Sequence, residues 1–180
     1  TEYPELVDLQ SYGKIVDIGE EDKDRITFQT SYVDGIDYNL VPDNDEMGGL
    51  ANDYYNYNII NKPIHVVGVW DGLSYISLYI NGVLVSFNEM APTVASLFIE
   101  PSTLFRIGSR YNVTDHFDGL IDRLSMWDVP LSQHQIVSLM NSESSESIEG
   151  LVAHYKFNSG NGNILYDHSG NGNHGTIHGA

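Results

Sequence analysis

The chain has 180 residues, of which 25 are acidic and 8 basic, so its formal net charge is −17. This charge excludes nucleic acid as a partner and disfavours docking on an anionic membrane, because both require a basic surface on the protein. No apolar run is long enough to cross a bilayer, and the first residues lack the basic and apolar segments of a signal peptide. The absence of cysteine excludes disulfides and zinc–thiolate sites. The length suits one domain of two packed layers.

Short strands are expected along most of the chain. In chain order they are Gly13–Ile18, Arg25–Thr30, Ile64–Trp70, Tyr75–Ile80, Val83–Phe87, Leu104–Gly108, Leu120–Trp127 and Leu151–Phe157. Residues 75–80 alternate, with Ile76, Leu78 and Ile80 on one face. Asn81-Gly82 lies between two apolar runs, which predicts a hairpin with a type I′ turn.

One helix is expected near residue 132. Ser132-Gln133-His134-Gln135 fits a capping box, and Ile136, Leu139 and Met140 give an apolar stripe. The Ser/Glu-rich stretch 141–149 reads as a polar linker between a body, residues 1–140, and a tail, residues 150–180. Many short strands with a single short helix predict an all-β sandwich of two antiparallel sheets.

Several segments resemble laminin-G-like, concanavalin A-like jelly-roll domains. Residues 64–85 (IHVVGVWDGLSYISLYINGVLV) are similar to that family's central hairpin, and residues 13–19 (GKIVDIG) to an earlier strand. Residues 104–140 are similar to its ending, through FDGLIDRLSMW and the helix that follows. Residues 150–180 (GLVAHYKF, then DHSGNGNHGT) resemble its opening. The resemblance implies a concanavalin A-like jelly roll.

The family's opening motif stands at the C-terminal end of this chain, which leaves three arrangements open. In the first arrangement, the domain is circularly permuted and the tail completes its own sandwich. Alternatively, the chain is one unit of a tandem array, or the tail adds a strand to a neighbouring subunit.

The tail motif Asp167–Gly175 is a candidate cation site. Asp167, Asn171 and Asn173 offer oxygen ligands at short spacing, and the intervening glycines allow tight turns, which suits calcium. The alternative is a Gly/Asn turn in which Asp167 is a local cap.

A second acid supports the same expectation. Period two places Asp122 on a face with Leu120, Leu124 and Met126, where a carboxylate needs a partner. That partner is Arg106, Arg123, backbone N–H groups or a metal. The resemblance implies a structural calcium near this acid, so we expect Asp122, Asp167, Asn171 and Asn173 to share one calcium ion.

The segment Asp43–Asn58 is a candidate ligand site, because it combines acids and amides with tyrosines in a long polar loop. The residues expected to bind are Asp43, Asn44, Asp45, Tyr54, Tyr55 and Tyr57. The alternative is that these tyrosines cover a sheet edge. Asn112-Val113-Thr114 fits an N-glycosylation site and permits a secreted setting.

Catalysis is not expected. The chain has no Gly-x-Ser-x-Gly motif, and no predicted strand carries two closely spaced acids on one face. The resemblance implies a non-catalytic extracellular recognition or adhesion module (a secreted or cell-surface lectin), whose partner is a glycan or a cell-surface or matrix protein. The alternative is a structural repeat of a surface layer or filament that assembles head to tail through its C-terminal tail.

Overall fold

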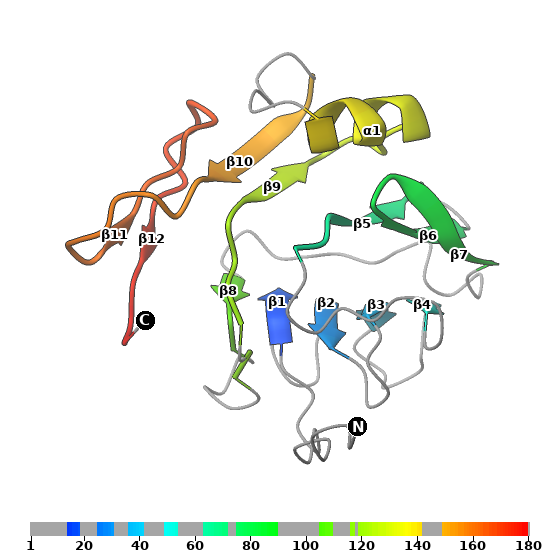
Figure 1. Ribbon diagram of the computed structural model, residues 1–180, viewed down its shortest axis with the longest axis horizontal. Coiled ribbons are helices and arrows are strands. Elements are labelled where there is room, and N and C mark those ends of the chain that lie inside the picture. Colours follow the sequence, from blue (N-terminus) through cyan, green and yellow to red (C-terminus); the bar gives the residue numbers. More distant parts are fainter. Residues whose placement is uncertain are drawn as a thin grey trace, which may run out of the picture. The chain divides into compact units, whose positions relative to one another are not determined.

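The structure is a computed structural model (Figure 1). It describes residues 63–71, 75–88, 105–109, 116–117, 119–141 and 149–179, and the backbone alone of Glu89 and of four strands before residue 54. The chain divides into two compact units, Thr1–Asp118 and Gly119–Ala180. The division precedes the strand at residue 124, so that strand and the helix after it lie in the same unit as residues 150–180.

The first unit contains a five-stranded antiparallel sheet. Its order is β4-β3-β2-β1-β8, and the strands are β1 (Lys14–Ile18), β2 (Arg25–Thr30), β3 (Ile36–Val41), β4 (Gly49–Asp53) and β8 (Phe105–Ile107). β1, β2 and β8 were predicted, whereas β3 and β4 were not. β4 falls inside the segment Asp43–Asn58, so the expectation of an uninterrupted loop there was wrong.

The second sheet of this unit has three antiparallel strands, β5 (Val66–Trp70), β6 (Tyr75–Ile80) and β7 (Val83–Glu89). Asn81 and Gly82 have φ values of 50° and 78°, so the predicted type I′ turn is confirmed. The inward face of β6 carries Ile76, Leu78 and Ile80, each with no exposed surface. The edge strand β4 of the five-stranded sheet contacts both β6 and β7.

The second unit consists of β9 (Leu124–Trp127), α1 (Gln133–Asn141), β10 (Leu151–Tyr155), β11 (Ile164–Leu165) and β12 (Gly175–Thr176). β10 pairs with β9 and β11 pairs with β12, both antiparallel. Leu131, Ile136, Ala153 and Tyr155 are buried and form the core of this unit. The first strand of the tail therefore pairs within its own chain.

The capping box at the start of α1 is confirmed. The backbone N–H of Ser132 donates to Oε1 of Gln135 at 2.9 Å, and the N–H of Gln135 donates to Oγ of Ser132 at 3.4 Å. These bonds satisfy groups that have no partner inside the helix. Ile136 is fully buried, and Leu139 and Met140 are half-buried, as the predicted stripe requires.

Each unit also holds one half-buried tryptophan, Trp70 in β5 and Trp127 in β9. Within the part of the chain that the structure describes, the indole Nε1 atoms of both are buried without a hydrogen-bond partner. Neither side chain is therefore positioned by a polar contact at its ring nitrogen, so the indoles are held by packing.

Candidate functional site

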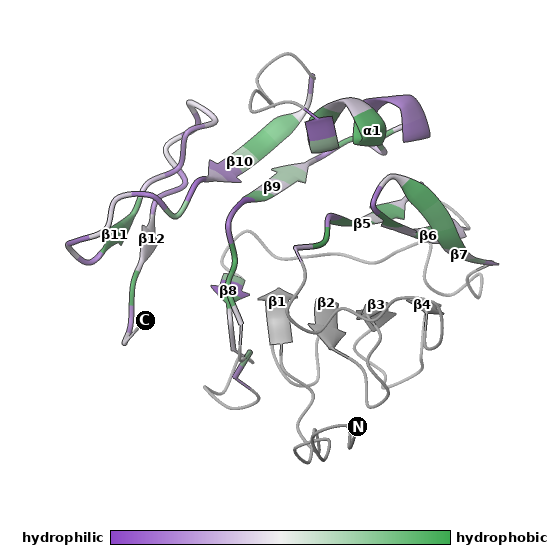
Figure 2. Cartoon of the chain, viewed as in Figure 1, coloured by the Kyte–Doolittle hydropathy of each residue, from purple (hydrophilic) through white to green (hydrophobic). Residues whose placement is uncertain are grey.

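The outer face of the β5–β6–β7 sheet is largely apolar. Cross-strand pairing opposite the buried face of β6 puts Val67, Val69, Tyr75, Ser77, Tyr79, Leu84 and Phe87 on this face. None of these side chains is charged, but the register also places the acidic residue Glu89 opposite Tyr75 on this face. The solvent face of an antiparallel sheet is ordinarily polar, so an apolar outer face is a candidate surface for a ligand or partner. In Figure 2 the β6–β7 hairpin is largely hydrophobic.

Two aromatic rings are the most exposed feature of this face. Tyr75 is 39% exposed and Phe87 is 55% exposed. Their ring centroids lie 4.9 Å apart with an interplanar angle of 18°, so the rings are stacked. Because each ring restricts the motion of the other, less side-chain entropy would be lost when a ligand binds to this apolar surface.

The ligand residues predicted from the sequence lie outside the fully described residues. The predicted ligand residues that the structure does not describe are Asp43, Asn44, Asp45, Tyr54, Tyr55 and Tyr57. The predicted glycosylation site Asn112 also lies outside the described residues. Their roles stay predictions.

A second polar site is built around Asp167, which is 8% exposed. Its Oδ1 accepts the backbone N–H groups of His154 and Ser169, each at 2.9 Å. Its Oδ2 accepts the hydroxyl of Ser169 at 2.8 Å and the backbone N–H of Asn173 at 2.9 Å. Four donors therefore occupy the roughly four acceptor positions of one carboxylate.

These bonds determine how Asp167 titrates. Burial acts to raise the pKa of this carboxyl, but the hydrogen bonds from His154, Ser169 and Asn173 outweigh it and lower the pKa from 3.8 to about 2. Burial raises the pKa of Tyr155, and the negative charge of Asp167 raises it further. Asp167 is therefore ionised at neutral pH although it is buried.

The two asparagines predicted as calcium ligands lie in the same cluster, and their amides act as donors. Nδ2 of Asn171 donates to the carbonyl oxygens of Leu151 at 2.8 Å and Val152 at 3.0 Å. Nδ2 of Asn173 donates to the Val152 carbonyl at 2.9 Å. The structure thus brings together three of the four predicted ligands, Asp167, Asn171 and Asn173.

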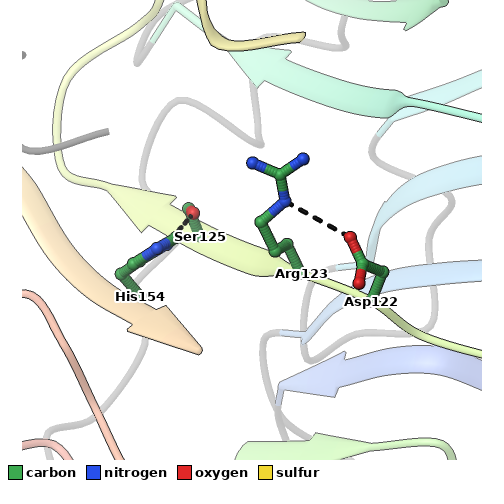
Figure 3. A network of polar contacts seen from close by, with 4 residues as sticks. All are labelled: Asp122, Arg123, Ser125 and His154. Carbon is green, nitrogen blue, oxygen red and sulfur yellow. Dashed lines mark hydrogen bonds and ion pairs between the residues drawn. The ribbon is translucent and has the colours of Figure 1, made fainter. Parts of the chain in front are cut away.

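Asp122 has a different environment. Its Oδ2 accepts Nε of Arg123 at 3.3 Å, and its side chain is 90% exposed. Leu120 is fully exposed, because β9 begins only at Leu124. The expectation that residues 120 and 122 belong to a buried stripe was therefore wrong, and Arg123 is the partner of this carboxylate. Figure 3 shows Asp122 well separated from His154, whose ring Nδ1 lies 2.7 Å from the Ser125 hydroxyl.

The described residues do not fit a calcium ion bound at Asp167. A cation needs oxygen lone pairs directed toward it, whereas the lone pairs of Asp167 are directed at N–H and O–H donors. Within the described ranges, no group of three or more His, Asp or Glu side chains is placed to hold a metal ion.

In the part of the chain that the structure describes, no helix has the length and apolar character needed to span a membrane.

Comparison with known families identifies the fold. Residues 51–137 match the model Laminin_G_3, described as the concanavalin A-like lectin/glucanases superfamily. The chain contains a laminin-G-like domain. This match confirms the concanavalin A-like β-sandwich predicted from the sequence, and it covers the β5–β6–β7 sheet with its aromatic pair.

Other comparisons add little to the laminin-G-like assignment. A comparison with curated proteins finds no match. Among solved structures, an S-layer domain-containing protein from Clostridium thermocellum matches with 17% identity and a TM-score of 0.40, over 78% of this chain and 69% of that one. Similarity at this level says nothing about the function of the laminin-G-like domain.

Two features of this chain were not identified from the sequence. Tyr75 and Phe87 lie on the faces of β6 and β7 opposite the apolar stripe, so the alternation already contained that signal. The contribution of Ser169 and the backbone of His154 to the Asp167 cluster had no such signal, since it depends on which strand the loop packs against.

Proposed function

We propose that this chain is a non-catalytic, extracellular recognition module that binds a neutral carbohydrate on the outer face of the β5–β6–β7 sheet. The exposed stacked pair formed by Tyr75 and Phe87, within the region that matches the concanavalin A-like superfamily, carries the proposal. A sugar ring has an apolar face rich in C–H groups, and an exposed aromatic ring is a suitable surface for it.

Charge restricts the class of glycan. The chain carries a net charge of −17, and the described side chains of this sheet face include no basic residue. Sulfated or uronic acid polymers would be repelled and would find no cation among these side chains. Neutral hexose polymers incur no such cost, so they are the proposed ligands.

The test is a panel of neutral and acidic glycans, followed by calorimetry on the ligand that binds best. We expect Tyr75→Ala or Phe87→Ala to weaken binding by about tenfold or more, since each removes part of a hot-spot aromatic surface. Tyr166→Ala is the matched control, because Tyr166 is a similarly exposed aromatic (49%) outside this sheet.

Three outcomes would contradict the proposal. They are no binding to any neutral glycan, stronger binding to acidic than to neutral glycans, and equal binding by wild type and both sheet variants. Hydrolysis of a glycan in the panel would instead show that the chain is an enzyme.

A structural role is the alternative function, in which copies of the chain assemble head to tail by exchanging the tail. In this structure β10 pairs with β9 of the same chain, so assembly requires that this pairing be broken and formed again between copies. Carbohydrate recognition needs no such rearrangement and is the function we propose.

A further inference from the structure

The edge of β10 that faces away from β9 is covered by a loop. The backbone N–H of His154 donates to Asp167, and its carbonyl accepts the N–H of His168 at 2.7 Å. Both polar groups of this residue are therefore directed to the loop, because in its antiparallel pair with Ser125 of β9 they point away from β9. A bridge between Tyr155 and Asp167 marks where the loop runs beside the strand.

Side chains of the loop cover the rest of this edge. The carbonyl oxygen of Val152 accepts the hydroxyl of Ser169 at 3.1 Å as well as the amides of Asn171 and Asn173. The carbonyl of Leu151 accepts the Asn171 amide. The loop thus supplies the donors and acceptors that a further strand would otherwise bring.

The same bonds hold the loop together without a metal. Asp167 accepts N–H groups from three positions, His154, Ser169 and Asn173, and so connects both ends of the loop to β10. A bound cation would have to displace these N–H donors from the carboxylate, and a buried donor that loses its acceptor costs free energy.

We propose that the loop Asp167–Asn173 is a metal-independent edge cap, which closes β10 against the addition of a further strand. An open strand edge presents a row of unpaired backbone groups on which a second copy of the chain can pair. A cap made mainly of side chains, with the backbone N–H of His168, fills these positions. The cap acts against self-association through β10, independently of what the β5–β6–β7 sheet binds.

The experiment compares wild type with Asp167→Asn and Asp122→Asn, each with added calcium and with a chelator. Both variants remove one negative charge, but only the first alters the cap. We expect calcium and chelator to leave the Tm of wild type and of Asp122→Asn unchanged. We expect Asp167→Asn to lower the Tm by several degrees, since an amide nitrogen would face N–H donors.

Hydrogen exchange and sedimentation test the closed edge directly. In Asp167→Asn we expect the amide of His154 to exchange about tenfold faster or more, and the protein to self-associate as its concentration rises. If Asp167→Asn does not fold, the double variant Asn171→Ala/Asn173→Ala retains the carboxylate and opens the Leu151–Val152 part of the edge. It should self-associate in the same way.

Two results would overturn the proposal. One is a rise in the wild-type Tm with calcium that either Asp122→Asn or Asp167→Asn abolishes, because it would show a shared metal site. The other is a variant that stays monomeric although its cap is altered. For Asp167→Asn this means that it does not self-associate and that the amide of His154 is still protected from exchange. For the double variant Asn171→Ala/Asn173→Ala it means that the protein does not self-associate. Neither result bears on glycan binding by Tyr75 and Phe87, so the two proposals fail separately.

Discussion

Asp167 shows how a charged side chain can be buried without a cationic partner. No Lys or Arg among the described residues bonds it, and four hydrogen bonds take the place of water around its oxygens. Hydrogen bonds to a charged acceptor are the stronger kind, so the desolvation cost is offset locally. Three of the donors lie within the motif itself: the N–H and the hydroxyl of Ser169 and the N–H of Asn173. The charged carboxylate therefore fixes the shape of the loop.

This bonding predicts a defined acid sensitivity. The pKa of Asp167 is lower in the folded state, about 2 against 3.8, so its contribution to stability is present above pH 4 and lost as the pH falls toward 2. The contribution is on the order of 1–2 kcal/mol. We expect the Tm difference between wild type and Asp167→Asn to shrink over that interval in thermal unfolding by circular dichroism. A difference that stays constant down to pH 2 would be inconsistent with this bonding.

The sequence identified Asp167 as a special residue but not its partners. The motif gave the acid, the glycines and the two asparagines, whereas the acceptor carbonyls of Leu151 and Val152 depend on tertiary packing. Asp122 was misplaced for a related reason. Period two was extended to residues before Leu124, where the strand has not yet begun, so an exposed carboxylate was assigned to a buried face.

At the scale of elements, patterns with strong local signals were predicted well. The hairpin β6–β7 has alternation and an Asn-Gly turn, and α1 has a capping box, so both agree closely with the structure. β3 and β4 contain Asp, Asn, Gly or Ala, which have low strand propensity. They are strands because β2 and β3 offer edges to pair with, which single-sequence patterns do not show.

The junction between α1 and β10 depends on one glycine. Gly150 has a φ of +86°, and a Cβ added there would lie 2.5 Å from Oδ1 of Asp128 and 2.8 Å from Cγ2 of Val129. Gly170 also has a positive φ, +93°, but its Cβ would meet nothing within 4 Å. Both alanine variants lose roughly 1 kcal/mol to backbone strain.

Only Gly150→Ala adds steric overlap, so we expect it to destabilise the protein by about 2 kcal/mol or more and Gly170→Ala by about 1 kcal/mol. Urea unfolding of both variants measures the difference. Equal losses would mean that Asp128 and Val129 move aside without cost.

At the scale of the whole molecule, the tail belongs to the same compact unit as β9 and α1. Two paired strands alone are marginally stable, and the second unit adds the packing of Leu131 and Ile136 beside Ala153 and Tyr155. The segment that resembles the family's opening, β10, thus pairs within one chain with β9, part of the segment that resembles its ending. The sequence motifs indicated these segments, whereas the pairing of β10 with β9 shows that they lie side by side.

Truncation after Asn141 tests this relationship. It removes β10 and the cap and leaves β9 without its partner strand, so we expect a lower Tm and faster amide exchange in residues 124–127. Sedimentation of the full chain should give a monomer at low micromolar concentration. A truncated chain with unchanged exchange in β9, or a full chain that polymerises head to tail, would favour the structural role instead.

The two tryptophans give each unit its own optical reporter. Trp70 lies in Thr1–Asp118 and Trp127 in Gly119–Ala180, and the chain contains no other tryptophan. Emission from single-tryptophan variants, Trp70→Phe and Trp127→Phe, therefore follows the two units one at a time. Coincident emission curves during denaturation would mean that the two units unfold together in one cooperative transition. Separated curves would mean that each unit unfolds independently.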